Sequence, residues 1–191
     1  MKLLLGALLA LVAGWCVFLS MLVRGYLRFR GQRVVTCPET RTPAGVAVNA
    51  WYASIDGLLG KPRLRLQSCS RWPERAGCGE KCLREIEGAP NGCLVRALLA
   101  EWYREKRCIL CGASVSDIRW HERRPGLVAT DGTTHEWSEF AAEELPDALR
   151  AHRPICWSCH VAETFRRSFP DLIVDRESIA RRQGLRAGAR E

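Results

Sequence analysis

Two pairs of cysteines, each separated by two residues, carry the clearest chemical signal in the sequence. Cys108 and Cys111 form the first pair, followed directly by Gly112, and Cys156 and Cys159 form the second. Two intervening residues let both thiolates of a pair reach one ion from a tight turn or a helix start, and four thiolates make a closed tetrahedral zinc site. The spacing therefore predicts zinc held by Cys108, Cys111, Cys156 and Cys159.

The second pair also supports a different interpretation, because a histidine follows it. Cys156, Cys159 and His160 match the c-type haem signature, in which the cysteines form thioethers and the histidine binds iron. The only methionines are in the first 21 residues, so a second axial ligand would be a histidine: His121, His135 or His152. Haem leaves Cys108 and Cys111 without a role. Zinc is thus the main prediction, with a membrane-tethered monohaem cytochrome c acting in electron transfer as the alternative, and disulfides as a third.

Five more cysteines form a second group: Cys37, Cys69, Cys78, Cys82 and Cys93. They are a candidate second metal site or cluster, although their spacing matches no ferredoxin pattern. Buried cysteines without a ligand are the alternative, and their odd number argues against a purely disulfide framework. Cys78 and Cys82 stand four apart, so they would share one face of a helix if that segment is helical.

An uncharged, mostly apolar run from Leu3 to Val23 predicts an uncleaved membrane anchor, since a helix of this length spans the hydrocarbon core of a bilayer. A cleaved signal peptide is the alternative, but the run continues to Arg24 without a small-residue cleavage site. Four arginines follow the run: Arg24, Arg28, Arg30 and Arg33. They predict a cytoplasmic main domain and contacts with anionic lipid headgroups. A haem-bearing domain would instead lie on the outer side.

Hydrophobic periodicity predicts an α+β fold of short antiparallel strands and helices behind the anchor. Antiparallel strands at 45–53 and 63–69 would bring Cys37 and Cys69 to one end. Further strands are predicted at 118–120, 127–130 and 135–140, with a turn at 131–132. Helices are predicted at 80–87, at 92–106 with Asn91 as its cap, at 144–151 and at 156–169. Four regions follow: an anchor with a basic stretch (1–33), a cysteine-containing region (34–106), a metal-binding region (107–175) and a mobile basic tail (176–191).

The order of a cysteine turn, a hairpin and a helix that opens with CxxC resembles a treble-clef zinc finger. The resemblance covers residues 107–169 and implies that Cys108, Cys111, Cys156 and Cys159 are the zinc ligands. Gly112 would supply the backbone freedom of the turn. The start of the helix would lower the cost of holding thiolates. Such fingers bind DNA, cut nucleic acids or dock proteins, so the resemblance selects no single task.

Composition limits the remaining choices. Lys and Arg number 29 against 21 Asp and Glu, for a net charge of +8, which suits a lipid surface or a nucleic acid. Arginines concentrate near the C-terminus: Arg166, Arg167, Arg176, Arg181, Arg182, Arg186 and Arg190. A nucleic-acid-contacting finger is therefore a further alternative, although a solvated tail explains the same charges. No catalytic residues are predicted. We expect a non-enzymatic docking or scaffold component at the membrane, with an unidentified protein partner.

Overall fold

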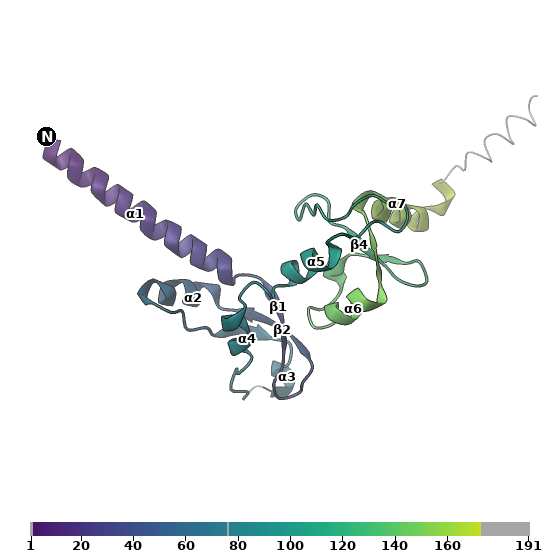
Figure 1. The fold of residues 1–191 in the computed structure, drawn as a ribbon, viewed down its shortest axis with the longest axis horizontal. Coiled ribbons are helices and arrows are strands. Elements are labelled where there is room, and N and C mark those ends of the chain that lie inside the picture. The colour runs from purple at the N-terminus through teal and green to yellow at the C-terminus, as the bar shows by residue number, and fades with distance from the viewer. Residues whose placement is uncertain (1, 76, 173–191) are drawn as a thin grey trace, which may run out of the picture. The chain divides into compact units, whose positions relative to one another are not determined.

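The computed structural model describes residues 2–75 and 77–172 (Figure 1). The predicted basic tail, 176–191, lies outside the described residues. The chain forms two compact units. The first unit comprises residues 1–104 with 138–150, and the second comprises 105–137 with 151–191. Segment 138–150, predicted as part of the metal-binding region, thus belongs to the first unit.

A single helix, α1 (Lys2–Phe29), contains the predicted apolar segment. Its 28 residues give a length of about 42 Å, compared with about 30 Å for the hydrocarbon core of a bilayer. The most apolar stretch within Leu4–Phe29 has a mean hydropathy of 2.3, and none of it is buried. Helix α1 is therefore long and apolar enough to cross a membrane.

A short helix, α2 (Ala50–Asp56), lies beside the C-terminal end of α1 (Figure 1). Gly25 permits this approach, because a Cβ atom there would lie 2.9 Å from Cβ of Ser54. The rings of Tyr26 and Trp51 pack 5.0 Å apart on the same pair of helices. A 3-10 helix, η1 (Gly57–Leu59), follows α2.

The first sheet contains β1 (Gln32–Thr36), β2 (Pro43–Val48) and β3 (Leu66–Cys69), in that order and antiparallel. Pairing of β2 with β3 was predicted, and Val46 lies opposite Cys69. The predicted strand 45–53 is too long, because Asn49 accepts a hydrogen bond from the backbone nitrogen of Tyr52 and begins α2. Strand β1 lies partly within the segment predicted as a basic juxtamembrane stretch.

Arg33 is a correction to the sequence analysis. It is fully buried rather than available to lipid headgroups. Its guanidinium donates hydrogen bonds to the carbonyl oxygens of Phe29 at 2.7 Å, Gly31 at 3.0 Å and Arg28 at 3.0 Å. These groups include carbonyls at the end of α1, so Arg33 caps that helix from β1.

The core of the first unit lies between the sheet and the helices that pack against it. Val35, Val46 and Val48 of the strands are buried together with Leu83 and Ile86. The remaining helices of this unit are α3 (Trp72–Arg75), α4 (Leu83–Gly88), α5 (Val95–Tyr103) and α6 (Leu145–Ala151).

Two of the predicted helices begin later than expected. Helix α4 begins at Leu83 rather than at residue 80, because Glu80 has a positive φ of 50°, which ends any helical run before it. Cys78 and Cys82 therefore do not share a helix face. Helix α5 begins at Val95 rather than after Asn91. The segment before it pairs with β1, where the carbonyl oxygen of Cys93 accepts a hydrogen bond at 2.8 Å.

The second unit has a small antiparallel sheet and one long helix. The strands are β4 (Gly126–Val128), β5 (Thr134–His135) and β6 (Arg153–Ile155), in the order β5-β4-β6. Helix α7 (Trp157–Ser168) follows β6, and two 3-10 helices complete the described chain, η2 (Trp137–Glu139) and η3 (Pro170–Leu172).

The predicted hairpin is present but shorter than expected. The turn at residues 131–132 is confirmed, with Gly132 at a φ of 80° and the Asp131 carboxylate accepting a hydrogen bond from the backbone nitrogen of Thr133. The predicted strand 118–120 is wrong, because the chain turns there and the nitrogen of Arg123 donates to the carbonyl of Arg119. Strand β6, which was not predicted, adds the third strand.

Candidate metal centre

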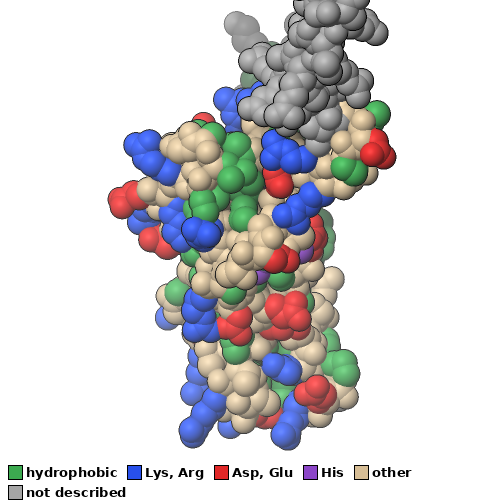
Figure 2. Space-filling model, turned by 90° about the vertical axis from the view of Figure 1, so that its right-hand side faces the viewer, with side chains coloured by type: hydrophobic (Ala, Val, Ile, Leu, Met, Phe, Trp, Pro, Cys, Tyr) green, Lys and Arg blue, Asp and Glu red, His purple; other side chains and the backbone are tan. Residues whose placement is uncertain are grey.

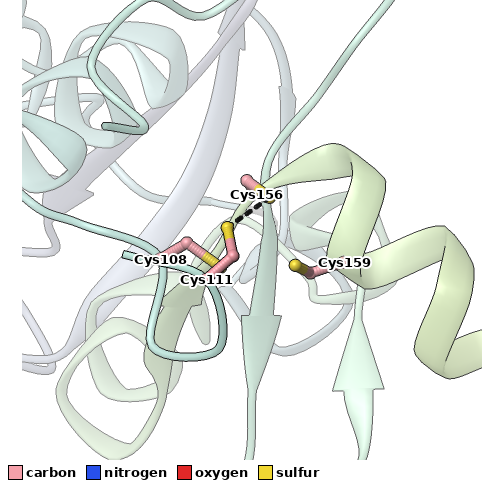
Figure 3. Close-up of side chains that lie close together, drawn as sticks. All are labelled: Cys108, Cys111, Cys156 and Cys159. Carbon is pink, nitrogen blue, oxygen red and sulfur yellow. Dashed lines mark hydrogen bonds between the residues drawn. The ribbon is translucent and has the colours of Figure 1, made fainter. Parts of the chain in front are cut away.

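The four cysteines of the two CxxC pairs lie together in the second unit (Figure 3). Their sulfur atoms all lie within 4.8 Å of one another, and the Sγ atoms of Cys111 and Cys156 are 3.6 Å apart. Four sulfurs at about 2.3 Å from a shared zinc ion would be about 3.8 Å from each other. A disulfide would need about 2.05 Å. The cluster is thus spaced to hold a metal ion.

The first pair is presented by a tight turn that the backbone holds closed. The nitrogen of Cys108 donates to the carbonyl of Ala113 at 2.8 Å, and the nitrogen of Gly112 donates back to the carbonyl of Cys108 at 2.9 Å. Gly112 has a φ of 72°, as the turn was predicted to require. Arg107 donates from its side chain to the Gly112 carbonyl at 3.2 Å. The turn leaves Cys108 buried and Cys111 exposed.

The second pair stands where β6 ends and α7 begins. Cys156 is the N-cap residue of α7, and Cys159 lies in the first turn of that helix. Strand β6 is joined to the cysteine turn, because the nitrogen of Ile109 donates to the carbonyl of Pro154 at 3.1 Å. This one hydrogen bond ties together two segments that are far apart in the sequence, and Figure 3 shows the sulfurs of both segments turned toward a common point.

Local electrostatics shift the pKa values of three of the thiols, and the directions differ. Burial opposes ionisation of Cys108, but backbone donors at Cys156, Cys111 and Leu110 outweigh it and lower the pKa of Cys108 to about 6. Burial and then the neighbouring thiols raise the pKa of Cys159. Burial also raises the pKa of Cys156, although this residue stands at the N-terminus of α7. The predicted benefit of the helix start is therefore outweighed at Cys156. A divalent cation would supply the positive charge that four thiolates need.

His160 stands apart from the four sulfurs. It is buried, and its ring lies against β4, where a Cβ atom at Gly126 would lie 3.0 Å from the ring. Haem ligation through His160 would require this packed ring to turn out of its site. Of the other predicted axial candidates, His135 and His152 have rings 5.8 Å apart, and the carbonyl oxygen of His135 also lies beside Gly126. The haem alternative stays a prediction.

The second predicted group of cysteines lies in the first unit, and four of its members surround one cavity. They are Cys37, Cys69, Cys78 and Cys82. Cys93 is not among the lining residues: its sulfur lies 3.6 Å from the carbonyl of Ala89.

Comparison with protein-family models, with curated proteins and with solved structures finds no match for this chain. The order of elements that the treble-clef resemblance implies is present, with a cysteine turn, the β4–β5 hairpin and a helix that begins after Cys156. Membership of that fold group stays a prediction.

Proposed function

We propose that this chain is a membrane-anchored protein whose second unit is held together by structural zinc and acts as a non-enzymatic docking or scaffold component. The observation that carries the proposal is the convergence of four sulfurs, from residues 108, 111, 156 and 159, within 4.8 Å of one another. Zinc is the ion favoured by an all-thiolate, four-coordinate donor set.

The small core of the second unit supports a structural role for the ion. Among its described residues, the buried apolar side chains are few: Cys108, Val115, Pro125, Leu127, Val128 and Ile155. Units with so little buried apolar surface depend on disulfides or metals for stability. A tetrathiolate zinc site supplies roughly 10–16 kcal/mol of binding free energy, which is available only to the folded chain.

The same donor set supports a role without catalysis. Catalytic zinc sites keep one coordination position open for water or substrate, whereas four cysteines close the coordination sphere. The ion would then fix the turn at Cys108 against the start of α7. The function of the ion would be to keep the surface around these two segments in one conformation.

Helix α7 offers such a surface to a protein partner. Val161, Phe165 and Phe169 follow at four-residue intervals on and just after this helix, and each side chain is exposed by 43–50%. The rings of Phe165 and Phe169 lie 5.1 Å apart. Figure 2 shows basic and acidic side chains interspersed on the face that it draws. On α7 itself, Glu163 lies 2.9 Å from Arg166, and such a mixture of charges suits a protein partner better than a nucleic acid. Exposed apolar side chains of this kind mark interaction sites.

Membrane attachment would come from α1, with the second unit on the cytoplasmic side. Arg24, Arg28 and Arg30 remain available as positive flanking charges after Arg33 is removed from that set. The test is fractionation of cells that express the full chain. We expect the protein in membranes after an alkaline wash, and a protease added to intact spheroplasts should leave the second unit uncut. Recovery in the soluble fraction would contradict the anchor, and cleavage from outside would contradict the orientation.

The docking role is tested by site-specific photo-crosslinking in the same cells. A photoreactive amino acid at Phe165 should give one discrete adduct of higher mass. The matched control is the same amino acid at the exposed Arg166, which points about 100° away from Phe165 around the same helix and should give none. Equal labelling from both positions, or no adduct from either, would contradict a docking role for α7.

A further inference from the structure

A second cluster of sulfurs lies in the first unit, around a cavity of about 20 Å³. This volume admits one water-sized guest. Four of the residues that line it are Cys37, Cys69, Cys78 and Cys82, and the others include apolar side chains such as Val35 and Trp72 as well as charged residues. The cavity is therefore small and surrounded by thiols, apolar side chains and charged side chains.

The turn that presents Cys37 repeats the turn that presents Cys108. The nitrogen of Cys37 donates to the carbonyl of Thr42 at 2.9 Å, and the nitrogen of Arg41 donates to the carbonyl of Cys37 at 2.8 Å. In the second unit the corresponding bonds measure 2.8 and 2.9 Å. Arg41 has a φ of 56°, a conformation uncommon for a residue other than glycine, where Gly112 has 72°. Both turns thus have the form that delivers a sulfur to a metal.

Thr40 stands at the position that Cys111 occupies in the other turn. A single cysteine in such a turn has to be completed by ligands from elsewhere in the fold.

The other three cysteines supply those ligands from two further segments. Cys69 ends β3, and its sulfur accepts a hydrogen bond from the backbone nitrogen of Arg71 at 3.4 Å. Cys78 and Cys82 come from the segment between α3 and α4. All three line the same cavity as Cys37.

The charges around the cavity favour a negatively charged centre. Arg71, Arg75 and Lys81 line it, against one acidic side chain, Glu39. Four thiolates around a divalent ion carry a net charge of about −2, and this excess of cations offsets it.

We propose that Cys37, Cys69, Cys78 and Cys82 bind a second divalent zinc-class ion. The four thiols lose their protons to solvent as four metal–sulfur bonds form, with no change of oxidation state. Among the described residues, only the four sulfurs of the first cluster all lie within 4.8 Å of one another. The sulfurs of Cys37, Cys69, Cys78 and Cys82 therefore have to come closer together when the ion binds.

Zinc content of the purified full chain in detergent tests the inference. We expect about two zinc ions per chain, falling to about one in Cys69→Ser and staying at about two in the matched control Cys93→Ser. The first centre is scored separately, because Cys108→Ser should also lose about one zinc ion. Wild-type protein with about one zinc ion, unchanged by Cys69→Ser, would overturn the second centre and leave the first intact. Loss of about one zinc ion in Cys69→Ser, with no loss in Cys108→Ser, would support the second centre and overturn the first.

A second test uses only the wild-type chain, so misfolding of a variant cannot affect it. The metal-depleted protein is titrated with Co²⁺. We expect the thiolate-to-cobalt absorption to rise until about two equivalents are bound. Saturation at one equivalent would overturn the second centre. A brown iron–sulfur chromophore in the protein as isolated anaerobically, or a disulfide among these four cysteines, would overturn it as well.

Discussion

The sulfur of Cys111 lies 3.6 Å from the sulfur of Cys156, although 45 positions separate the two residues along the chain. Cys111 lies exposed in a turn, and Cys156 is the N-cap residue of α7. The hydrogen bond from Ile109 to Pro154 holds their segments together. A shared ion would therefore link the turn that carries Cys111 to the start of α7. The stability of the second unit should depend on that ion.

Metal removal should unfold the second unit. A strong chelator added to the full chain in detergent takes away the ion that its small core requires, and Cys108→Ser should have the same effect. We expect loss of amide-exchange protection in β4, β6 and α7. The control is Cys16→Ser, on the exposed surface of α1, which should retain protection. Protection that survives both the chelator and Cys108→Ser would contradict a structural ion.

His160→Ala separates zinc from haem. The ring packs against Gly126 and lies outside the sulfur cluster. We therefore expect a loss of stability of about 1–3 kcal/mol with no change in zinc content. Denaturant titration and metal analysis of the same sample provide both values. Cys159→Ser, in the same turn of α7, should lose zinc. A haem-containing wild type whose Soret band changes in His160→Ala would support the cytochrome alternative instead.

Arg33→Met should destabilise the first unit by about 2–4 kcal/mol, because three backbone carbonyls lose a charged hydrogen-bond donor. Thermal unfolding in detergent measures the change. Arg30→Met is the matched control, since Arg30 is exposed and three positions away. Equal effects of the two substitutions would show that the helix end does not depend on Arg33.

Gly25→Leu should separate α2 from α1. A Cβ atom at Gly25 meets Ser54 at 2.9 Å, including backbone at 3.1 Å, so one helix has to shift, at a cost of about 1–3 kcal/mol. Gly14→Leu is the control on the same helix, because no atom lies within 4 Å of a Cβ there. Faster proteolysis within α2 is expected only for Gly25→Leu. Matching digestion of the two variants would argue against close packing of these helices.

The first metal centre could be predicted from the sequence because each half of it is local. A CxxC pair shows its two ligands and its turn within five residues, and Gly112 marks the conformation the turn requires. The second cluster is not visible in this way. Thr40 takes the place of the second cysteine in the Cys37 turn, and the positive φ falls on Arg41 rather than on a glycine. The predicted strand pairing brings Cys69 near Cys37, but only the folded chain shows that Cys78 and Cys82 line the same cavity and that Cys93 does not.

Other features depend on tertiary contacts that local patterns do not record. Arg33 follows an apolar run, so its charge suggested a lipid contact, yet the end of α1 and β1 enclose it. Strand β6 has three residues, one of them Pro154, and forms because β4 pairs with it on the side opposite β5. Short strands of this kind are determined by their partners more than by their own residues.

X-ray absorption at the zinc edge tests the central claim most directly. The sample is the full chain carrying Cys69→Ser, which leaves the Cys108 centre as the one to be measured. We expect about four sulfur neighbours at about 2.3 Å and no nitrogen or oxygen in the first coordination sphere. Zinc bound through nitrogen or oxygen atoms, or a protein that carries haem and no zinc, would contradict the tetracysteine centre.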